Sequence, residues 1–280
     1  MPLAAMDPPQ PMSTAPLPTR LDATQNEGAA HTNVDCEEYI AWKTWMSDQF
    51  GQYTNLDAAY FSAEVELRKA ERARVLELGF GNGTFLGWAR DMGAEVHGVE
   101  ANPLLVMRAQ EMFGTIHTHS RLDAPELDAL RGAFSHIVAF DVLEHIEQRD
   151  YPGLFSRFTE LLTPGGKCIL RYPNGDSPFG RRIQNGDPTH VTAIGRDKLA
   201  YFARRAGLTV EVVRSPALPT SGVGWRRAAK RHVILAMRFC VEAFLGLAYY
   251  GRRIPLGENS TAVLIRPAAS KAVPPPDYKH

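Results

Sequence analysis

The sequence predicts an α/β fold, a doubly wound and mostly parallel sheet of seven strands with helices on both faces. Short apolar runs alternate with stretches of helical periodicity from residue 75 onward. One of these runs leads directly into a glycine-rich turn at residues 79–83. With 280 residues, 44% hydrophobic and 22% charged, the chain is long and apolar enough to bury a full core.

The individual elements follow from the same patterns, taken in chain order. Apolar spacing of three to four predicts helices over 36–50, 58–70, 84–91, 103–112, 151–162 and 197–206. Compact apolar runs predict strands over 75–78, 95–99, 115–119, 136–140, 167–172, 209–213 and 261–265. Thr163-Pro164-Gly165-Gly166 predicts a turn before the fifth strand.

The domain organisation has four parts. Residues 1–33 include six prolines among the first eighteen and predict a disordered tail, which lacks the apolar core of a secretory signal. We expect the main domain at 34–213 together with 261–268, a helical insertion at 214–260 and a flexible tail at 269–280. The three cysteines form no CxxC pair, which favours a reducing cytoplasm over a disulfide or zinc framework.

A buried strand running into Gly79-Phe80-Gly81-Asn82-Gly83 predicts a ligand site at the carboxyl end of the sheet. Glu100 ends the next strand, 21 residues after Gly79, where a carboxylate can accept hydrogen bonds from ribose hydroxyls. The spacing is GxGxG and not the GxGxxG of dinucleotide sites. Glu77 would repel a pyrophosphate but suits an ammonium group. These features favour S-adenosylmethionine over a nicotinamide dinucleotide.

At these motifs the chain resembles a known family. ELGFGNG, GVEANP (98–103), FDVLEHI (140–146) and LLTPGGKCIL (161–170) are similar to class I S-adenosylmethionine-dependent methyltransferases, which have a Rossmann-like fold. The resemblance covers about 55–213 and the last strand, and is strongest to the branch of ubiquinone-biosynthesis O-methyltransferases and bacterial enzymes acting on sugars and small molecules.

The resemblance implies a set of cofactor-binding residues. The glycine turn would flank the methionine moiety, Glu100 and the adjacent Ala101 would hold the ribose, and Asp141 would border the sulfonium. The stretch after the third strand, 119–123, departs from the family's usual acidic pattern, so Leu122 and Asp123 are its candidate adenine contacts.

Two histidines are candidates for a general base, which a hydroxyl acceptor would need near neutral pH. His145 ends the segment Asp141–His145, whose positions i, i+3 and i+4 share one face of a helical turn. This segment could instead form a hydrogen-bonded support for the cofactor site, or hold a divalent metal, although we expect none. His190, with Asp187 to orient it, lies in the loop after the fifth strand, which could also be only a turn system.

The insertion contains a long apolar segment at 226–250. Arg227, Arg231, Arg238 and Glu242 fall within about 60° on a helical wheel, and the rest of the circumference is apolar. Such a helix favours peripheral contact with a membrane surface, and its two charges near the centre make a membrane span unfavourable. A substrate lid or core helix and an oligomer contact are the alternatives, and the sequence leaves the oligomeric state open.

The sequence therefore predicts O-methylation of a small molecule, sugar or lipid-linked intermediate in the cytoplasm, at the inner face of the membrane if the helix docks there. A non-catalytic cofactor-binding or membrane scaffolding protein is the alternative, and a nicotinamide-dependent oxidoreductase is a weaker one. Nucleic acid is not expected as a partner, because 31 basic residues balance 31 acidic ones and no N-P-P-Y-type motif follows the fourth strand.

Overall fold

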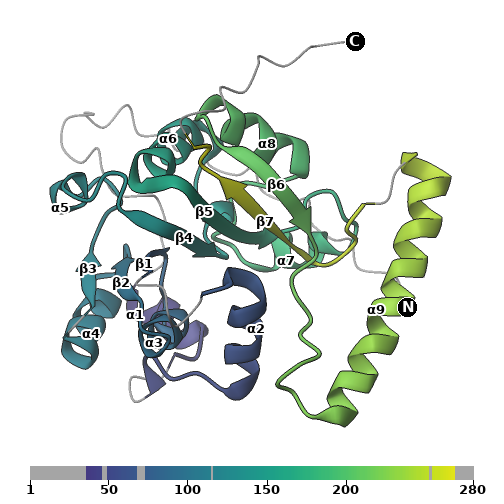
Figure 1. The fold of residues 1–280 in the computed structure, drawn as a ribbon, viewed down its shortest axis with the longest axis horizontal. Coiled ribbons are helices and arrows are strands. Elements are labelled where there is room, and N and C mark those ends of the chain that lie inside the picture. Colours follow the sequence, from purple (N-terminus) through teal and green to yellow (C-terminus); the bar gives the residue numbers. More distant parts are fainter. Residues whose placement is uncertain (1–35, 46–48, 68–72, 115, 252–253, 269–280) are drawn as a thin grey trace, which may run out of the picture. The chain divides into compact units, whose positions relative to one another are not determined.

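Seven strands form one sheet in the order β3-β2-β1-β4-β5-β7-β6 in the computed structural model, which describes residues 36–45, 49–67, 73–114, 116–251 and 254–268 (Figure 1). The strands are β1 Arg74–Leu78, β2 Glu95–Val99, β3 His117–His119, β4 Phe134–Phe140, β5 Leu162–Pro173, β6 Thr209–Arg214 and β7 Asn259–Ile265. Only β7 runs antiparallel to its neighbours β5 and β6. The predicted mostly parallel seven-stranded sheet is confirmed.

The fifth strand differs most from its prediction. It begins at Leu162 and not at Lys167, so it includes the segment that predicted a turn. Its pairing with β4 jumps from Phe134↔Leu162 to His136↔Lys167, which marks an irregular step at this segment. Gly165 has a φ of 80° there. The glycine pattern therefore indicated a local distortion within the strand.

The helices follow the predicted alternation with the strands. They are α1 Cys36–Trp42, α2 Asn55–Val65, α3 Thr84–Asp91, α4 Pro103–Phe113, α5 Pro125–Asp128, α6 Tyr151–Leu161, α7 Gly180–Gly186, α8 Arg196–Arg205 and α9 Trp225–Leu245. A π-helical turn, Gly246–Tyr250, extends α9, and 3-10 turns cover Leu143–His145 and Gln148–Asp150. The short helices α5 and α7 were not predicted.

Two helices, α1 and α2, have boundaries that differ from the prediction for physical reasons. α1 ends at Trp42, and Thr44 has a φ of 55°, which a helix cannot contain. α2 begins three residues before the predicted position because Thr54 and Asp57 form a reciprocal capping box. It ends at Val65 because Glu66 is left-handed. Residues 1–35 and 269–280 lie outside the described residues, so both predicted tails stay predictions.

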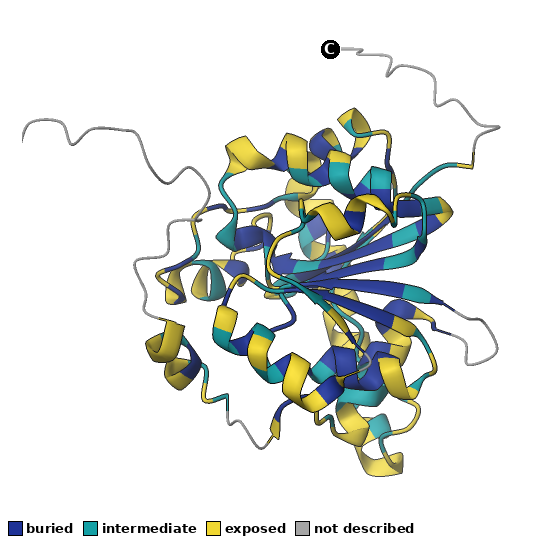
Figure 2. Cartoon of the chain, turned by 90° about the vertical axis from the view of Figure 1, so that its left-hand side faces the viewer, coloured by how far each residue is buried: buried dark blue, intermediate teal, exposed yellow. Residues whose placement is uncertain are grey.

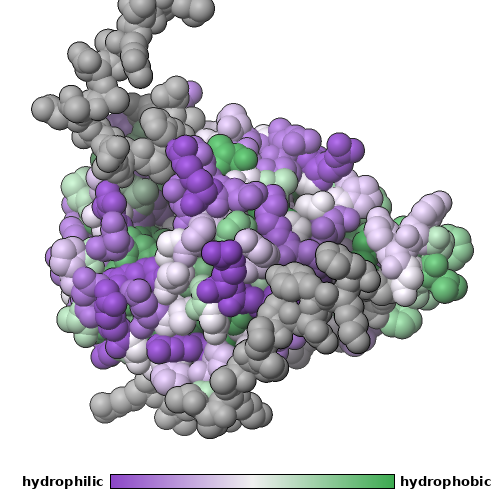
Figure 3. Space-filling model, turned by 90° about the horizontal axis from the view of Figure 1, so that it is seen from above, coloured by the Kyte–Doolittle hydropathy of each residue, from purple (hydrophilic) through white to green (hydrophobic). Residues whose placement is uncertain are grey.

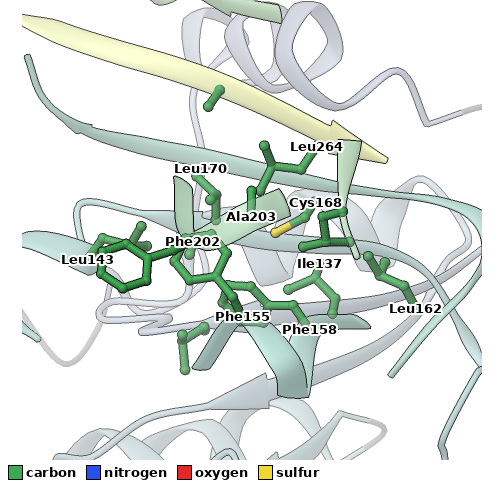
Figure 4. Close-up of a cluster of buried hydrophobic side chains, with 14 of the residues drawn as sticks. Ile137, Leu143, Phe155, Phe158, Leu162, Cys168, Leu170, Phe202, Ala203 and Leu264 are labelled. Carbon is green, nitrogen blue, oxygen red and sulfur yellow. The ribbon is translucent and has the colours of Figure 1, made fainter. Parts of the chain in front are cut away.

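Each face of the sheet carries its own hydrophobic core, as the buried strands between two helical layers show in Figure 2. On one face, Phe155 and Phe158 of α6 and Phe202 of α8 pack on Ile137 and Leu264 of the sheet (Figure 4). On the other face, the core includes Phe61, Phe85, Trp88 and Phe113 from α2, α3 and α4. Helices on both faces fix the sheet, so the loops at its carboxyl edge start from rigid positions.

Candidate active site

The glycine turn between β1 and α3 lies at the carboxyl edge of the sheet. Gly79, Gly81 and Gly83 have φ values of 69°, 51° and 69°, in the left-handed region that favours glycine. The amide of Gly79 donates to the carbonyl of Val99 at 2.7 Å, which holds the start of the turn against the end of β2. A β-carbon added to Gly79 would lie 2.5 Å from the side chain of Val142. The turn therefore requires glycine, as its sequence predicted.

The segment between α1 and α2 covers this turn, which the sequence did not indicate. A β-carbon on Gly81 would lie 2.8 Å from the ring of Trp45. One on Gly87, in the middle of α3, would lie 2.0 Å from the carbonyl oxygen of Gly51. Gly87 could have indicated this contact from the sequence, because a glycine inside a helix is unfavourable and is often present where another backbone approaches closely.

Phe80 and Asn82 have different environments within the turn. Phe80 is buried, and a β-carbon on Gly98 of β2 would lie 2.7 Å from its ring, so it packs beneath the turn. The side-chain oxygen of Asn82 is buried and has no hydrogen-bond partner among the described residues. Asn82 therefore has an acceptor available for a ligand, whereas Phe80 supports the turn.

Glu77, at the end of β1, is buried with one carboxylate oxygen, Oε2, lacking a hydrogen-bond partner among the described residues. Burial, and next the neighbouring Glu100, raise the pKa of Glu77 well above its ordinary value. A cationic ligand would relieve both effects. This orphaned carboxylate therefore fits the ammonium and sulfonium groups of the expected cofactor and disfavours a pyrophosphate.

Glu100 connects the end of β2 to the glycine turn. Its Oε2 accepts from the amide of Gly81 at 3.0 Å, and its Oε1 accepts from the amide of Asn102 at 3.0 Å. Burial raises the pKa of Glu100. Each carboxylate oxygen has a second lone pair, so both can still accept from the hydroxyls of a ribose. Ala101 follows on the exposed side of this bend.

The candidate adenine contacts lie beyond β3. Leu122 is partly buried against the core, and its carbonyl accepts from Nε of Arg157 at 3.1 Å. Asp123 is exposed and pairs with Arg121 through two contacts of 2.8 Å. That guanidinium lowers the pKa of Asp123. Leu122 thus offers an apolar surface, while the carboxylate of Asp123 is already engaged.

Asp141 lies directly after β4, where its φ of 57° bends the chain away from the strand. Its carboxylate accepts from Nε of Arg171 at 2.9 Å, and Arg171 occupies the neighbouring position in β5. Arg171 also donates to the hydroxyl of Tyr60 at 2.9 Å. Arg171 was not predicted from the sequence, although a cation near the end of an otherwise apolar strand is a signal of a functional residue.

The chain beyond Asp141 brings together three of the groups that the sequence singled out. Donor atoms of Glu144, His145 and His190, here called the histidine cluster, all lie within 4.8 Å of one another. Asp141 is not part of this group, although the sequence placed it on one face with Glu144 and His145. The amides of Val191 and Thr192 donate to the carbonyl of Glu144 at 2.8 and 3.0 Å, which folds the loop after β5 onto the 3-10 turn.

Asp187 lies next to both candidate histidines, near His190 directly and linked to His145 through Thr189. Its Oδ2 is 3.6 Å from Nε2 of His190, which is within ion-pair range but longer than a hydrogen bond, so the orienting role of Asp187 stays a prediction. Its Oδ1 accepts from the hydroxyl of Thr189 at 2.5 Å, and the same hydroxyl oxygen lies 2.9 Å from Nδ1 of His145. Lys43 donates to Asp187 at 3.2 Å across 144 positions of sequence, a contact that no local pattern reveals.

These contacts determine the tautomer of His145. The single hydroxyl proton of Thr189 goes to the carboxylate of Asp187, because a charged acceptor forms the stronger and shorter hydrogen bond. Nδ1 of His145 must then carry the hydrogen and donate to Thr189. In the neutral ring this leaves Nε2 of His145 with a lone pair, which is the form that accepts a proton.

Burial sets the charges within the histidine cluster. It raises the pKa of Glu144 to about 8, with a further contribution from Asp141. Burial, and next the neighbouring His190, lower the pKa of His145. At neutral pH, Glu144 is therefore mainly protonated and His145 is neutral. Oε2 of Glu144 and Nδ1 of His190 are buried without hydrogen-bond partners among the described residues, so both can meet a polar ligand.

Two groups in the described part of the chain have the residue types and spacing of a metal site. One is the histidine cluster. The other is Glu95, His97 and His117 on β2 and β3, where Glu95 is already paired with Arg74 at 2.7 and 2.9 Å. That cation competes directly with a metal for the Glu95 carboxylate, so of the two groups the histidine cluster is the better suited to a metal.

Comparisons with known proteins agree with this geometry. Residues 52–213 match the family described as a methyltransferase domain. The ubiquinone biosynthesis O-methyltransferase of Xanthomonas euvesicatoria is 28% identical over 169 residues, covering 55% of this chain and 69% of that protein. The corresponding protein of Xanthomonas axonopodis is also 28% identical over 169 residues, with the same coverage.

Solved structures show the same fold. A methyltransferase from Archaeoglobus fulgidus described as dependent on S-adenosylmethionine superposes with a TM-score of 0.57 at 17% identity, covering 81% of this chain and 99% of that one. An S-adenosylmethionine-dependent methyltransferase from Mesorhizobium loti gives 0.51 at 18% identity, covering 75% and 100%. This chain therefore shares its overall fold with these proteins.

Proposed function

Because this chain belongs to the class I S-adenosylmethionine-dependent methyltransferases, we propose that it methylates a hydroxyl group and that the histidine cluster accepts the hydroxyl proton. The observation that carries the proposal is the oriented, neutral His145 next to His190, on the loops that follow the carboxyl ends of β4 and β5. A general base of this kind needs a pKa near or below the working pH and a fixed lone pair.

We assign cofactor binding to residues around the glycine turn. The three glycines would allow close backbone approach, the Glu100 carboxylate would accept from the ribose, and the buried Glu77 carboxyl group would hold the cationic end. Asp141, which Arg171 holds in place, would border the reacting group. The bound cofactor supplies an activated methyl group, so the chain's own contribution is mainly to orient the acceptor and exclude water.

Proton transfer is the second contribution. Nε2 of His145 would take the proton that the acceptor hydroxyl loses on methylation, while the sulfonium of the bound cofactor would supply the methyl group and be left as a neutral thioether. The resulting imidazolium is stabilised by Asp187 through Thr189. We assign acceptor binding to the buried Nδ1 of His190, an assignment supported by Asp187 lying at the other ring nitrogen, Nε2.

The acceptor we propose is a small molecule, a sugar or a lipid-linked intermediate in the cytoplasm. An oxygen acceptor is supported by the curated relatives, which are ubiquinone biosynthesis O-methyltransferases. The non-catalytic alternative would need the glycine turn but would not need an oriented histidine. A nicotinamide cofactor is disfavoured by the GxGxG spacing, and a fluorescence titration with NADH should give no binding signal.

A methyl-transfer screen tests the proposal. Cofactor labelled in its methyl group is incubated with fractionated small molecules, glycans and lipids, and the labelled product is identified. His145→Gln should then lower kcat by about a hundredfold or more, because general-base catalysis contributes about that much. Cofactor affinity measured by calorimetry should not change. Full kcat in both His145→Gln and His190→Gln would exclude the histidine cluster as the base.

A further inference from the structure

Two charged side chains of α9, Glu242 and Arg231, contact the domain, whereas most of its apolar side chains are exposed. Glu242 is only 8% exposed and accepts from the amide of Leu256 at 3.1 Å. Arg231 donates to the carbonyl of Pro219. By contrast, Phe244 is 69% exposed and Leu247 is 84% exposed. The charged stripe that the sequence predicted therefore serves in part to attach the helix to its own chain.

The outward apolar surface is broad. Hydrophobic atoms gather at the right of Figure 3, on the side where Figure 1 draws α9. The helix with its π turn, Trp225–Tyr250, is long and apolar enough to cross a membrane, yet only 11% of its apolar window is buried. From Leu235 round to Val241, both exposed, the arc covers about 240° at 100° per residue and is wholly apolar from Val233 onward, while Arg226, Lys230 and His232 fall within it in the first turns. A helix-pairing seam is much narrower than this.

The insertion is also strongly cationic. Residues 214–260 contain eight Lys or Arg and two Asp or Glu, a formal charge of +6 in a chain whose total is zero. Arg226, Arg227 and Lys230 are exposed at the first turns of α9, beside Trp225, which is 76% exposed. Tyr249 and Tyr250 end the apolar run and are also exposed. Cations and aromatic rings beside an apolar surface match the interface of an anionic bilayer.

The connections of α9 exclude a membrane crossing. Before the helix, the amide of Ala217 donates to the buried Glu64 of α2 at 2.6 Å. After it, Ser177 donates to the carbonyl of Leu256 at 2.9 Å, and Asn174 donates to that of Pro255 at 2.9 Å. Both ends are thus fixed to the same domain. A crossing helix would place its ends about 30 Å apart on opposite sides of the hydrocarbon, with irregular backbone returning through it.

Strand directions show which edge of the domain α9 extends from. β6 runs parallel to β5, because both are antiparallel to β7, so β6 ends at the carboxyl edge. β7 begins at that edge, with Asn259 opposite Pro173 at the end of β5. The insertion therefore leaves and re-enters the sheet at the edge that carries the glycine turn. Leu256 also contacts the segment that leads from β5 to His190.

We propose that α9 docks in the plane of an anionic lipid bilayer, with its apolar arc in the headgroup region and the carboxyl edge of the sheet turned toward the membrane. The docking itself follows from α9 alone. Its consequence, that the methyl acceptor is an amphiphile held at the membrane, rests on the proposed function. The two statements are tested by different measurements, vesicle binding and methyl transfer.

Vesicle co-sedimentation of the full chain tests the docking. Wild type should bind vesicles of phosphatidylcholine mixed with phosphatidylglycerol, and bind phosphatidylcholine alone far more weakly. Replacing Arg226, Arg227 and Lys230 together by Gln should weaken binding about a hundredfold, and raised salt should do the same. The matched control replaces Arg131, Arg204 and Arg205 by Gln. These residues precede the starts of β4 and β6, at the opposite edge of the sheet, so the same charge is removed and binding should be unchanged.

Two further variants separate docking from other roles of α9. Phe244→Ser with Leu247→Ser should abolish vesicle binding while cofactor affinity, measured by calorimetry, is retained. Failure of the wild type to bind anionic vesicles would overturn the proposal. So would a wild-type dimer that ignores vesicles and dissociates in the Phe244/Leu247 variant, which would make the apolar arc a subunit contact.

Depth measurements test the in-plane orientation. In a chain with Cys36 and Cys240 replaced by Ser, a fluorophore is attached to a cysteine introduced at Ala229 or at Leu247. Lipid-borne quenchers at different depths should locate both labels at a similar level. A helix that crosses the bilayer would separate them by about 27 Å, at 1.5 Å per residue, and that result would refute the in-plane arrangement.

Discussion

Replacing Glu144 by Gln should stabilise this protein at neutral and alkaline pH. The side chain is 1% exposed, and burial raises its pKa to about 8. A carboxyl whose pKa is higher in the folded than in the unfolded chain binds its proton preferentially in the folded state. Its contribution to stability is therefore fully present below its ordinary pKa of 4.5 and is lost as the pH rises toward 8. Gln keeps the shape and the neutral charge over this whole range.

The magnitude follows from the size of the shift. Each pH unit between the two pKa values changes the free energy of unfolding by about 1.4 kcal/mol. The difference between the free energies of unfolding, Gln variant minus wild type, should therefore increase by roughly 3 kcal/mol between pH 5 and pH 7. Since His145 and the other titrating groups are common to both proteins, their contributions cancel in the difference.

Urea denaturation of both proteins at pH 5, 6, 7 and 8 measures this difference. The gap between their free energies of unfolding should widen steadily with pH. If Glu144 is instead ionised and paired with a charged His190, the order reverses, and Glu144→Gln destabilises the protein most at neutral pH. That outcome would refute a neutral Glu144 and with it the charge distribution proposed for the histidine cluster.

Three other results are expected. Glu100→Ala should abolish cofactor binding in calorimetry while leaving the melting temperature of the cofactor-free protein within a few degrees; unchanged affinity would invalidate the ribose assignment. Methyl transfer should survive exhaustive treatment with EDTA, because His145 is oriented by Thr189 and Asp187, and activity restored only by a divalent metal would show that the histidine cluster is a metal site. Glu64→Ala should lower the free energy of unfolding by about 3 kcal/mol or more, because it leaves Arg214 without its 2.7 Å carboxylate partner. Urea denaturation measures this loss, and a value below 1 kcal/mol would show that this buried contact contributes little.

The sheet and its glycine turn could be predicted because their signals are local. Helix α3 was predicted to the residue, since the glycine turn fixes its start and Gly93, with a φ of 85°, follows its end. The helix expected over 36–50 was too long for a related reason. Trp45 fits the helical spacing of aromatic residues in this segment, but it lies beyond the end of α1 and packs on the glycine turn. The spacing therefore arose from packing contacts and not from a continuous helix.

The candidate site was predicted only in pieces. His145 and His190 were each singled out from their own segments, but their meeting depends on the loop after β5 folding back onto Glu144. Arg171 was not singled out, because an apolar run that contains one charged residue still predicts a strand and says nothing about the role of the charge. Lys43 donates to Asp187, which is 144 positions away in the sequence. Contacts of this range depend on the packed fold and leave no periodic trace in the sequence.

The antiparallel pairing of β6 with β7 has a consequence for how this chain tolerates its insertion. The end of β6 and the start of β7 lie side by side at one edge of the sheet. The chain between them therefore forms a closed loop, whatever its length. Closing a longer loop costs only about 0.6 kcal/mol for each doubling. The segment that forms α9 can therefore be exchanged or shortened at small thermodynamic expense, provided that Arg214, Ala217, Pro255 and Leu256 keep their contacts with the domain. This hairpin is thus a position where the same catalytic sheet can be fitted to different cellular surroundings.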